Sequence, residues 1–131
     1  MNKKNYLIIS GGTGGHVIPA VNFGNFIIEN GYDCFLLVDH RGKKYANKFK
    51  GKIKIINSSS FSNNLFNKFY ALILHLIGFF QSCKYVISIM PSSCISFGSY
   101  ATFMPLFVLV FLRFFGFTKI FIHEQNSVMG R

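Results

Sequence analysis

The sequence has no tryptophan, only 3 cysteines and 3 prolines, and only 4 acidic residues. The cysteines form no Cys-x-x-Cys pair and no paired histidines accompany them, so neither a metal site nor a disulfide framework is expected. The scarcity of carboxylates also leaves few side chains for acid–base catalysis. The 131 residues suffice for one domain with a substantial core.

Basic residues, by contrast, are abundant. The 14 Lys and Arg give a formal net charge of +10. Such an excess attracts anionic surfaces, either phospholipid or nucleic acid, although compositional drift explains it equally well. The phenylalanines lie in periodic apolar runs rather than between the basic residues of 41–54, so no nucleic-acid partner is expected.

No apolar segment is an obvious membrane span or signal peptide. The apolar run behind Met1–Lys4 stops after about five residues, and a signal peptide needs roughly seven to fifteen, so we expect the chain to stay in the cytoplasm. Phe103–Leu112 meets a charge after about ten apolar residues, and Leu65–Phe80 is interrupted by Lys68 and His75, whereas a span needs about twenty. An apolar patch edged by Lys and Arg on an anionic leaflet fits better. The alternative is that both segments only cover the sheet.

A glycine-rich loop is the most informative feature of the chain. Residues Ser10–Ala20 hold four glycines and directly follow the apolar run Tyr6–Ile9. A strand that ends in glycines and then meets a helix start brings backbone N–H groups close to a ligand, at the positive end of the helix dipole. His16 ends the loop with a side chain suited to proton transfer near neutral pH. The loop therefore predicts a phosphate site with a candidate general base beside it.

Two common nucleotide-binding motifs do not fit this loop. The Walker pattern needs a lysine that is absent here, and the dinucleotide fingerprint started at Gly12 and Gly14 has Val17 at its third position. Asp39, at the end of the next apolar run, has the place of the ribose-binding acid of that fingerprint. A nicotinamide-binding domain therefore remains a weaker alternative.

Three motifs lie along the chain: Gly11–His16 with Pro19-Ala20, Phe97–Thr102 with Pro105, and His123–Val128 with Gly130. Together they resemble the MurG family, bacterial glycosyltransferases that add N-acetylglucosamine from its UDP donor to lipid I, the undecaprenyl-diphosphate-linked muramoyl pentapeptide. The first and last are specific. The middle one departs from the family, which has Gly-Gly-Tyr and a serine where this chain has Gly98-Ser99-Tyr100 and Thr102. If that backbone requires a positive φ, a serine there costs about a kcal/mol or more.

The resemblance implies roles for individual residues. Thr13, Gly14 and Gly15 approach the donor nucleotide sugar or the acceptor diphosphate, Asn126 contacts the donor, and Gly98, Tyr100 and Thr102 belong to the acceptor's diphosphate site. UDP-N-acetylglucosamine and lipid I are the implied partners, with no cofactor and no metal, at the cytoplasmic face of the bacterial inner membrane.

Few titratable groups remain for catalysis at such a site. Glu29 and Asp33 flank a turn at the opposite edge of the sheet, and His75 lies among apolar residues of a helix. Asp39 and His40 stand at a strand end in an otherwise unremarkable basic stretch, so His16, His123 and Glu124 are left. His16 is the first choice for the general base, near the acceptor hydroxyl, and Glu124 the second. The alternative for His16 is a residue that only caps the helix or binds phosphate.

Strand and helix patterns alternate without hairpin signals, which predicts a parallel sheet with right-handed crossovers. The expected strands are Asn5–Ser10, Cys34–Val38, Ile53–Ile56, Ser93–Phe97 and Thr118–Ile122. The expected helices run from Ile18 to the stop signal Asn30-Gly31, within 41–54, from Leu65 to Met90, and from Pro105 to Phe115. Composition alone leaves Tyr85–Ile89 open as a strand, and the family comparison favours helix. All three motifs then follow carboxyl ends of strands, which share one ligand-binding edge.

The fold class is therefore an open parallel Rossmann-like α/β sheet with helices on both faces, the N-terminal half of a GT-B glycosyltransferase. Family members have a second domain that supplies most donor contacts. We expect residues 1–131 to be a truncated acceptor-side domain without that donor-binding C-terminal domain. It should be inactive alone and need a separate donor-binding domain. The alternative is a non-catalytic, membrane-associated remnant or subunit of the same fold.

Overall fold

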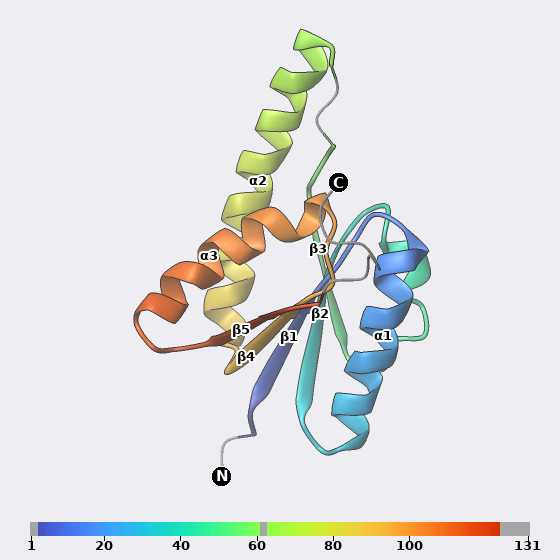
Figure 1. Ribbon diagram of the computed structural model, residues 1–131, viewed down its shortest axis with the longest axis vertical. Coiled ribbons are helices and arrows are strands. Elements are labelled where there is room, and N and C mark those ends of the chain that lie inside the picture. Colours follow the sequence, from blue (N-terminus) through green and yellow to red (C-terminus); the bar gives the residue numbers. More distant parts are fainter. Residues whose placement is uncertain (1–2, 61–62, 124–131) are drawn as a thin grey trace.

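The computed structural model describes residues 3–60 and 63–123. Five parallel strands form one sheet in the order β3-β2-β1-β4-β5 (Figure 1). The strands are β1 (Asn5–Ile9), β2 (Asp33–Asp39), β3 (Lys52–Ile56), β4 (Ser93–Ser96) and β5 (Lys119–Ile122). The helices are α1 (Gly14–Glu29), α2 (Leu65–Ile89) and α3 (Phe103–Phe114), with short 3₁₀ turns η1 (Lys43–Tyr45) and η2 (Tyr100–Thr102). This confirms the expected fold class.

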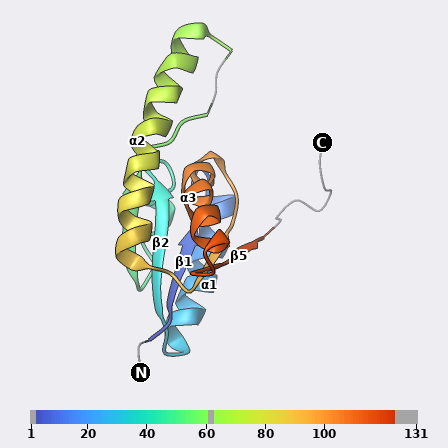
Figure 2. The same ribbon diagram turned by 90° about the vertical axis from the view of Figure 1, so that its left-hand side faces the viewer.

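The core lies on both faces of the sheet. Successive side chains of a strand point to opposite faces, so β1 sends Ile8 toward α1 and sends Leu7 and Ile9 toward α2 and α3. All three side chains are fully buried. Figure 2 shows α2 and α3 together on one side of the sheet. Burial on both faces explains the almost continuous apolar run of this strand.

Helix α1 begins at Gly14, one turn earlier than the expected start at Ile18. The amides of His16 and Val17 both donate to the Thr13 carbonyl, at 3.2 and 3.1 Å, and these bonds start the helix. Pro19 consequently lies inside the helix rather than in its first turn. Because Pro19 has no N–H, the carbonyl of Gly15 lacks its usual helical donor. Gly15 is exposed, so water can bond to this carbonyl instead.

The helix expected within 41–54 is wrong, because only the single turn η1 forms there. Its bonds are of the tight i to i−3 kind, from Tyr45 N to Gly42 O and from Ala46 N to Lys43 O, each at 3.0 Å. Lys44 and Lys48 would repel each other at i,i+4 spacing along a longer α-helix, with no acidic partner in this segment.

Helix α2 continues through Tyr85–Ile89, as the family comparison favours over the strand. It ends where Met90 adopts a left-handed φ of 45°, directly before Pro91. Ser82, Val86 and Ile89 are buried near this end, whereas the other end projects past the sheet (Figures 1 and 2).

Helix α2 is longer than the segment Leu65–Phe80, which was expected to be too interrupted to span a membrane. All 25 residues are helical, and an 18-residue window has a mean hydropathy of 1.5, so α2 is long and apolar enough to cross a membrane by these criteria alone. Lys68 and His75 therefore do not interrupt the helix. The packing of Ser82, Val86 and Ile89 into the fold is nevertheless incompatible with hydrocarbon surrounding the whole helix.

Candidate functional site

The carboxyl edge of the sheet brings together the first glycine loop (residues 10–16), the second glycine loop (residues 97–102) and the end of β5. The Ser10 amide donates to Leu37 O, the Phe97 amide to Ile9 O, and the His123 amide to Ser96 O, at 3.0, 2.9 and 2.8 Å. These bonds extend the sheet ladder by one residue at neighbouring strand ends. Of the predicted site residues, Glu124 and Asn126 lie outside the described residues.

His16 is held against the second glycine loop. Its Nδ1 lies 2.9 Å from the carbonyl oxygen of Phe97, and a carbonyl only accepts, so Nδ1 carries the proton and donates. The neutral ring then keeps its lone pair on Nε2, the form that a general base requires. Gly98, with φ +85°, lies beside this ring: a Cβ there would be 3.5 Å from Nδ1.

Phe97 also contacts the second histidine of this edge. Its ring stacks on His123 with centroids 5.0 Å apart and an interplanar angle of 22°. His123 is exposed, whereas His16 is half-buried. The backbone of Phe97 therefore orients one histidine and its ring supports the other.

The N-terminus of α1 offers donors to an anion. The amides of Gly14 and Gly15 are the first of the helix and have no acceptor within the described part of the chain. Thr13 precedes them as an exposed residue whose side chain makes no capping hydrogen bond. Gly12 reaches this turn with a φ of +76°. This arrangement can bind a phosphate group by its N–H groups and by the helix dipole.

Asp39 is a site residue whose role the sequence reasoning missed. It ends β2, is 1% exposed, and accepts four hydrogen bonds: from the amides of Gly12 and Gly42 at 2.9 and 2.8 Å, from Arg41 Nε at 2.9 Å and from Ser58 Oγ at 3.3 Å. The available signal was a lone carboxylate at the carboxyl end of a strand. Because its oxygens already have these partners, Asp39 is unsuited to bind a ribose, and the nicotinamide alternative loses its main support.

The partners of Asp39 keep the carboxylate charged. Burial raises the pKa of this carboxyl, but the Gly12 and Gly42 amides and the Arg41 guanidinium outweigh burial and hold the pKa below its ordinary value. The first glycine loop is thereby fixed to the end of β2 through a charge-assisted hydrogen bond at Gly12.

The second glycine loop contains a strained serine. Ser99 has φ +93° and ψ 162°, a region that is essentially restricted to glycine, so the position does require a positive φ. Its Oγ accepts from the Ala101 amide at 3.1 Å, and its carbonyl accepts from the Thr102 hydroxyl at 2.8 Å. Thr102 is buried and serves this turn with its hydroxyl.

Comparing two substitutions at this position should isolate the strain. Ser99→Ala and Ser99→Gly both remove the hydroxyl, but only glycine adopts this backbone freely. We expect Ser99→Gly to be more stable than Ser99→Ala by about 0.5–2 kcal/mol, after allowance for the greater unfolded-state entropy of glycine. Urea unfolding of both variants measures the difference. Equal stability, or a more stable alanine variant, would show that residue 99 is not strained.

Tyr100 begins η2, at the C-terminal end of the second glycine loop. It lines an apolar groove of about 670 Å³ between α2 and α3, together with Phe103, Leu106, Phe107 and Val110. His75 forms part of the groove wall as a buried residue, with Nε2 2.8 Å from Ser59 O. The second loop thus connects the groove to the histidine site.

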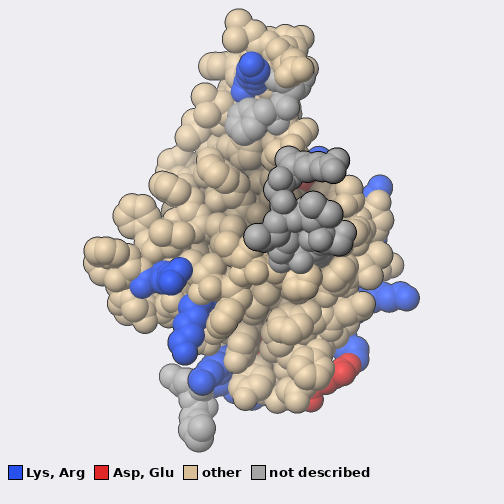
Figure 3. Space-filling model, in the orientation of Figure 1, with Lys and Arg blue, Asp and Glu red and all other residues tan. Residues whose placement is uncertain are grey.

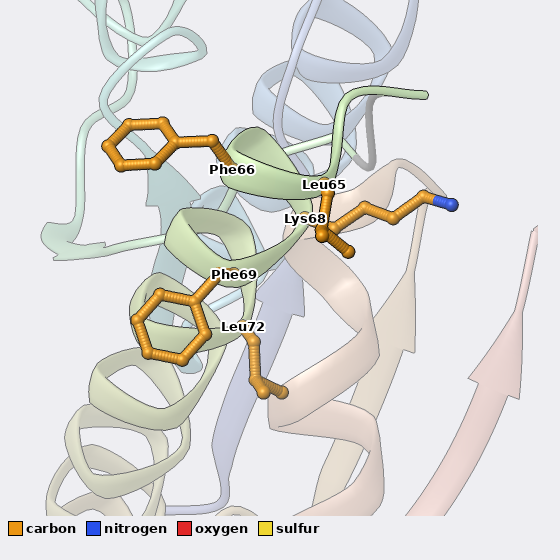
Figure 4. A pocket seen from close by; sticks show the side chains of 5 residues that line it. All are labelled: Leu65, Phe66, Lys68, Phe69 and Leu72. Carbon is orange, nitrogen blue, oxygen red and sulfur yellow. The ribbon is translucent and has the colours of Figure 1, made fainter.

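A second hollow, of about 600 Å³, lies at the projecting end of α2 and is lined by Leu65, Phe66, Lys68, Phe69 and Leu72. Figure 4 shows the rings of Phe66 and Phe69 on one side of the helix and the Lys68 side chain on the other. This end therefore carries exposed apolar rings close to a positive charge.

Comparisons with known proteins agree with this geometry. Residues 6–131 match the family described as the glycosyltransferase family 28 N-terminal domain. The chain is 39% identical over 129 residues to the UDP-N-acetylglucosamine–N-acetylmuramyl-(pentapeptide) pyrophosphoryl-undecaprenol N-acetylglucosamine transferase of Rickettsia prowazekii, and 35% identical over 128 residues to that of Rickettsia felis. Each alignment covers 98% of this chain but only 31% and 34% of the relative, so the chain spans about a third of their length.

Solved structures share the fold. MurG of Acinetobacter baumannii superposes with a TM-score of 0.76 at 22% identity over 99% of this chain and 37% of its own. The kitacinnamycin glycosyltransferase superposes with a TM-score of 0.70 at 11% identity, over 98% of this chain and 32% of its own. The predicted resemblance to the MurG family is confirmed, and the chain belongs to the family of glycosyltransferase family 28 N-terminal domains.

Proposed function

We propose that this chain is the acceptor-binding part of a transferase that moves N-acetylglucosamine from UDP-N-acetylglucosamine to lipid I at the cytoplasmic face of the bacterial inner membrane. The observation that carries the proposal is the His16 imidazole, whose Nδ1–H donates to Phe97 O and whose Nε2 has no partner among the described residues. The substrates are those in the names of the Rickettsia relatives.

In this proposal the histidine acts as general base. The acceptor hydroxyl gives its proton to Nε2 of His16 as its oxygen bonds to the anomeric carbon of the donor. The bond from that carbon to the diphosphate oxygen breaks, and UDP leaves with the electron pair. The amides of Gly14 and Gly15 bind diphosphate oxygens, since they are unpaired donors at a helix N-terminus.

The second glycine loop suits a lipid-linked acceptor. Gly98 lies against His16, and Tyr100 lies in the apolar groove between α2 and α3. The diphosphate of the acceptor would bind at the second glycine loop, and its lipid chain would lie in the adjacent groove. Ser99 stands where the resemblance implies a glycine, and Thr102 where it implies a serine, so this loop departs from the family pattern.

Transfer assays test the proposal directly. The relatives are about three times as long, so transfer by this chain should need a donor-binding domain supplied separately, for example from a Rickettsia relative. Restored transfer to lipid I supports the proposal. If transfer is not restored although both parts are folded and associated, the result favours a non-catalytic subunit of the same fold. Full turnover by the chain alone would contradict the proposal that a separate domain binds the donor.

The surface of α2 supports a peripheral position on the membrane. Phe66 and Phe69 are 77% and 64% exposed, and Figure 3 shows basic side chains scattered over the viewed face, including near the projecting end of this helix. Such a surface combines apolar insertion with attraction to anionic lipid.

We expect the chain to float with anionic liposomes and to be released by high salt or alkaline carbonate, because a screened charge attraction contributes to binding. The double variant Phe66→Ser with Phe69→Ser should bind at least about tenfold more weakly, since two rings lose apolar burial. Phe26→Ser, which alters an exposed ring on α1, is the matched control and should bind normally. Binding that resists both salt and carbonate would indicate an integral protein instead.

A further inference from the structure

The guanidinium of Arg41 is fixed at one nitrogen and open at the others. Nε donates to Asp39 Oδ2 at 2.9 Å, and the arginine side chain is 49% exposed while that of Asp39 is 2% exposed. Neither terminal nitrogen has a hydrogen-bond partner among residues 3–60 and 63–123. The buried Asp39 carboxylate thus fixes the orientation of the Arg41 guanidinium through Nε.

The open side of Arg41 lies next to the first glycine loop. Nη2 is 3.9 Å from the place that a Cβ on Gly12 would occupy, so the absence of a side chain there leaves the guanidinium close to the loop backbone. Both Gly12 and Arg41 bond to the same carboxylate, through Oδ1 and Oδ2 respectively. One buried group therefore fixes the loop and the arginine relative to each other.

The chemistry of this pair suits a phosphate ligand. A guanidinium presents a planar fork that matches phosphate oxygens, and its hydrogen bonds to an anion are among the stronger ones in proteins. The charge of Asp39 opposes an anion, but its buried oxygens face donors of the chain, so an anion at the loop would contact the guanidinium and not the carboxylate.

We propose that Arg41 binds the diphosphate of a substrate at the first glycine loop, and that Asp39 is the positioning residue that holds the guanidinium there. The proposal rests on the proposed function, in which the amides of Gly14 and Gly15 bind that same diphosphate. Both the sugar donor and the lipid acceptor carry a diphosphate, and the chemistry of Arg41 suits either.

Binding of inorganic pyrophosphate to the full 131-residue chain tests the proposal, with the amide resonances of Gly12, Gly14 and Gly15 followed by NMR. Arg41→Gln should weaken binding about ten- to hundredfold, as expected for the loss of hydrogen bonds between charged groups. Lys48→Gln is the matched control, because it removes the same charge from an exposed position in the same segment, and should change binding less than about twofold. Equal effects of the two variants would overturn the proposal, since only the net charge would then matter.

Asp39→Asn separates positioning from charge. Removal of a negative charge alone should strengthen anion binding, whereas loss of the anchor for Arg41 should weaken it. We expect weaker binding, and no further loss when the change is added to Arg41→Gln. Tighter binding by Asp39→Asn would overturn the positioning role. If that variant does not fold, Arg41→Gln and its control still decide whether Arg41 binds the diphosphate.

Two further probes identify the source of the diphosphate. A selective loss of UDP binding in Arg41→Gln assigns Arg41 to the donor, and a selective loss of binding to geranyl diphosphate assigns it to the acceptor. Normal binding of both probes by Arg41→Gln would overturn the proposal. The proposed function fails separately if the unaltered chain shows no shift of the Gly14 and Gly15 amides with any of the three ligands.

Discussion

Replacing His16 with alanine is expected to lower turnover about 100- to 10,000-fold in an enzyme reconstituted from this chain and a donor-binding domain. The free Nε2 of this ring is the proposed acceptor of the hydroxyl proton, and alanine leaves no substitute at that position. Single-turnover transfer to lipid I measures the chemical step. His40→Asn is the matched control, because the exposed His40 bonds only to the Asn57 side chain among the described contacts, and it should retain normal turnover.

A smaller effect would give His16 another role. A decrease of only a few-fold, together with a higher KM for the acceptor, would mean that the ring positions the diphosphate rather than taking the proton. The pH profile separates these cases further. A base that must be neutral produces a falling acidic limb in kcat/KM, and that limb should disappear in His16→Ala.

Replacing Asp39 with alanine is expected to lower the free energy of unfolding by about 3 kcal/mol. The substitution leaves the Gly12 and Gly42 amides without their acceptor, and each unpaired buried donor costs about 1–3 kcal/mol. Urea unfolding measures the change. Glu29→Ala is the control, because its ion pair with Lys50 is exposed on both sides and should contribute less than about 1 kcal/mol.

The same carboxylate should make stability depend on pH. The pKa of Asp39 is lowered in the folded chain, so its contribution is fully present above the ordinary carboxyl pKa of about 4 and is lost as the pH falls from there through the folded pKa. Asp39→Asn should therefore flatten the acid side of the stability profile. An unchanged acid limb in that variant would place the responsible carboxylate elsewhere.

Much of the sheet could be predicted from the sequence because its central strands β1 and β2 are short apolar runs that are mostly buried. β1 and β4 were predicted to within one residue: each expected strand ended one residue later than the observed strand, at Ser10 and at Phe97. The start of α1 and the segment of η1 were wrong for different reasons. Helix α1 begins earlier because the amides of His16 and Val17 bond to Thr13 O, which takes the helix back over Gly14 and Gly15. The turn η1 is short because Asp39 binds the amide of Gly42 just before it and the lysines of this segment disfavour a longer α-helix.

Only those residues of the candidate site that stand together in the sequence could be predicted. Its glycines and His16 stand together in a motif, so the sequence indicates them directly. Asp39 and Arg41 form a different case, because their role depends on an approach to Gly12 from 27 and 29 positions along the chain, which only the parallel pairing of β1 and β2 produces.

The two ends of α2 should differ in local stability. Near its C-terminal end the helix buries Ser82, Val86 and Ile89, so those turns can open only when the domain itself unfolds. The turns around Phe66 and Phe69 are exposed and can fray alone at little cost. A bilayer that covered those rings would remove this fraying, so the ordering entropy of a few helical turns would oppose membrane attachment, and mutations that stiffen them would favour it.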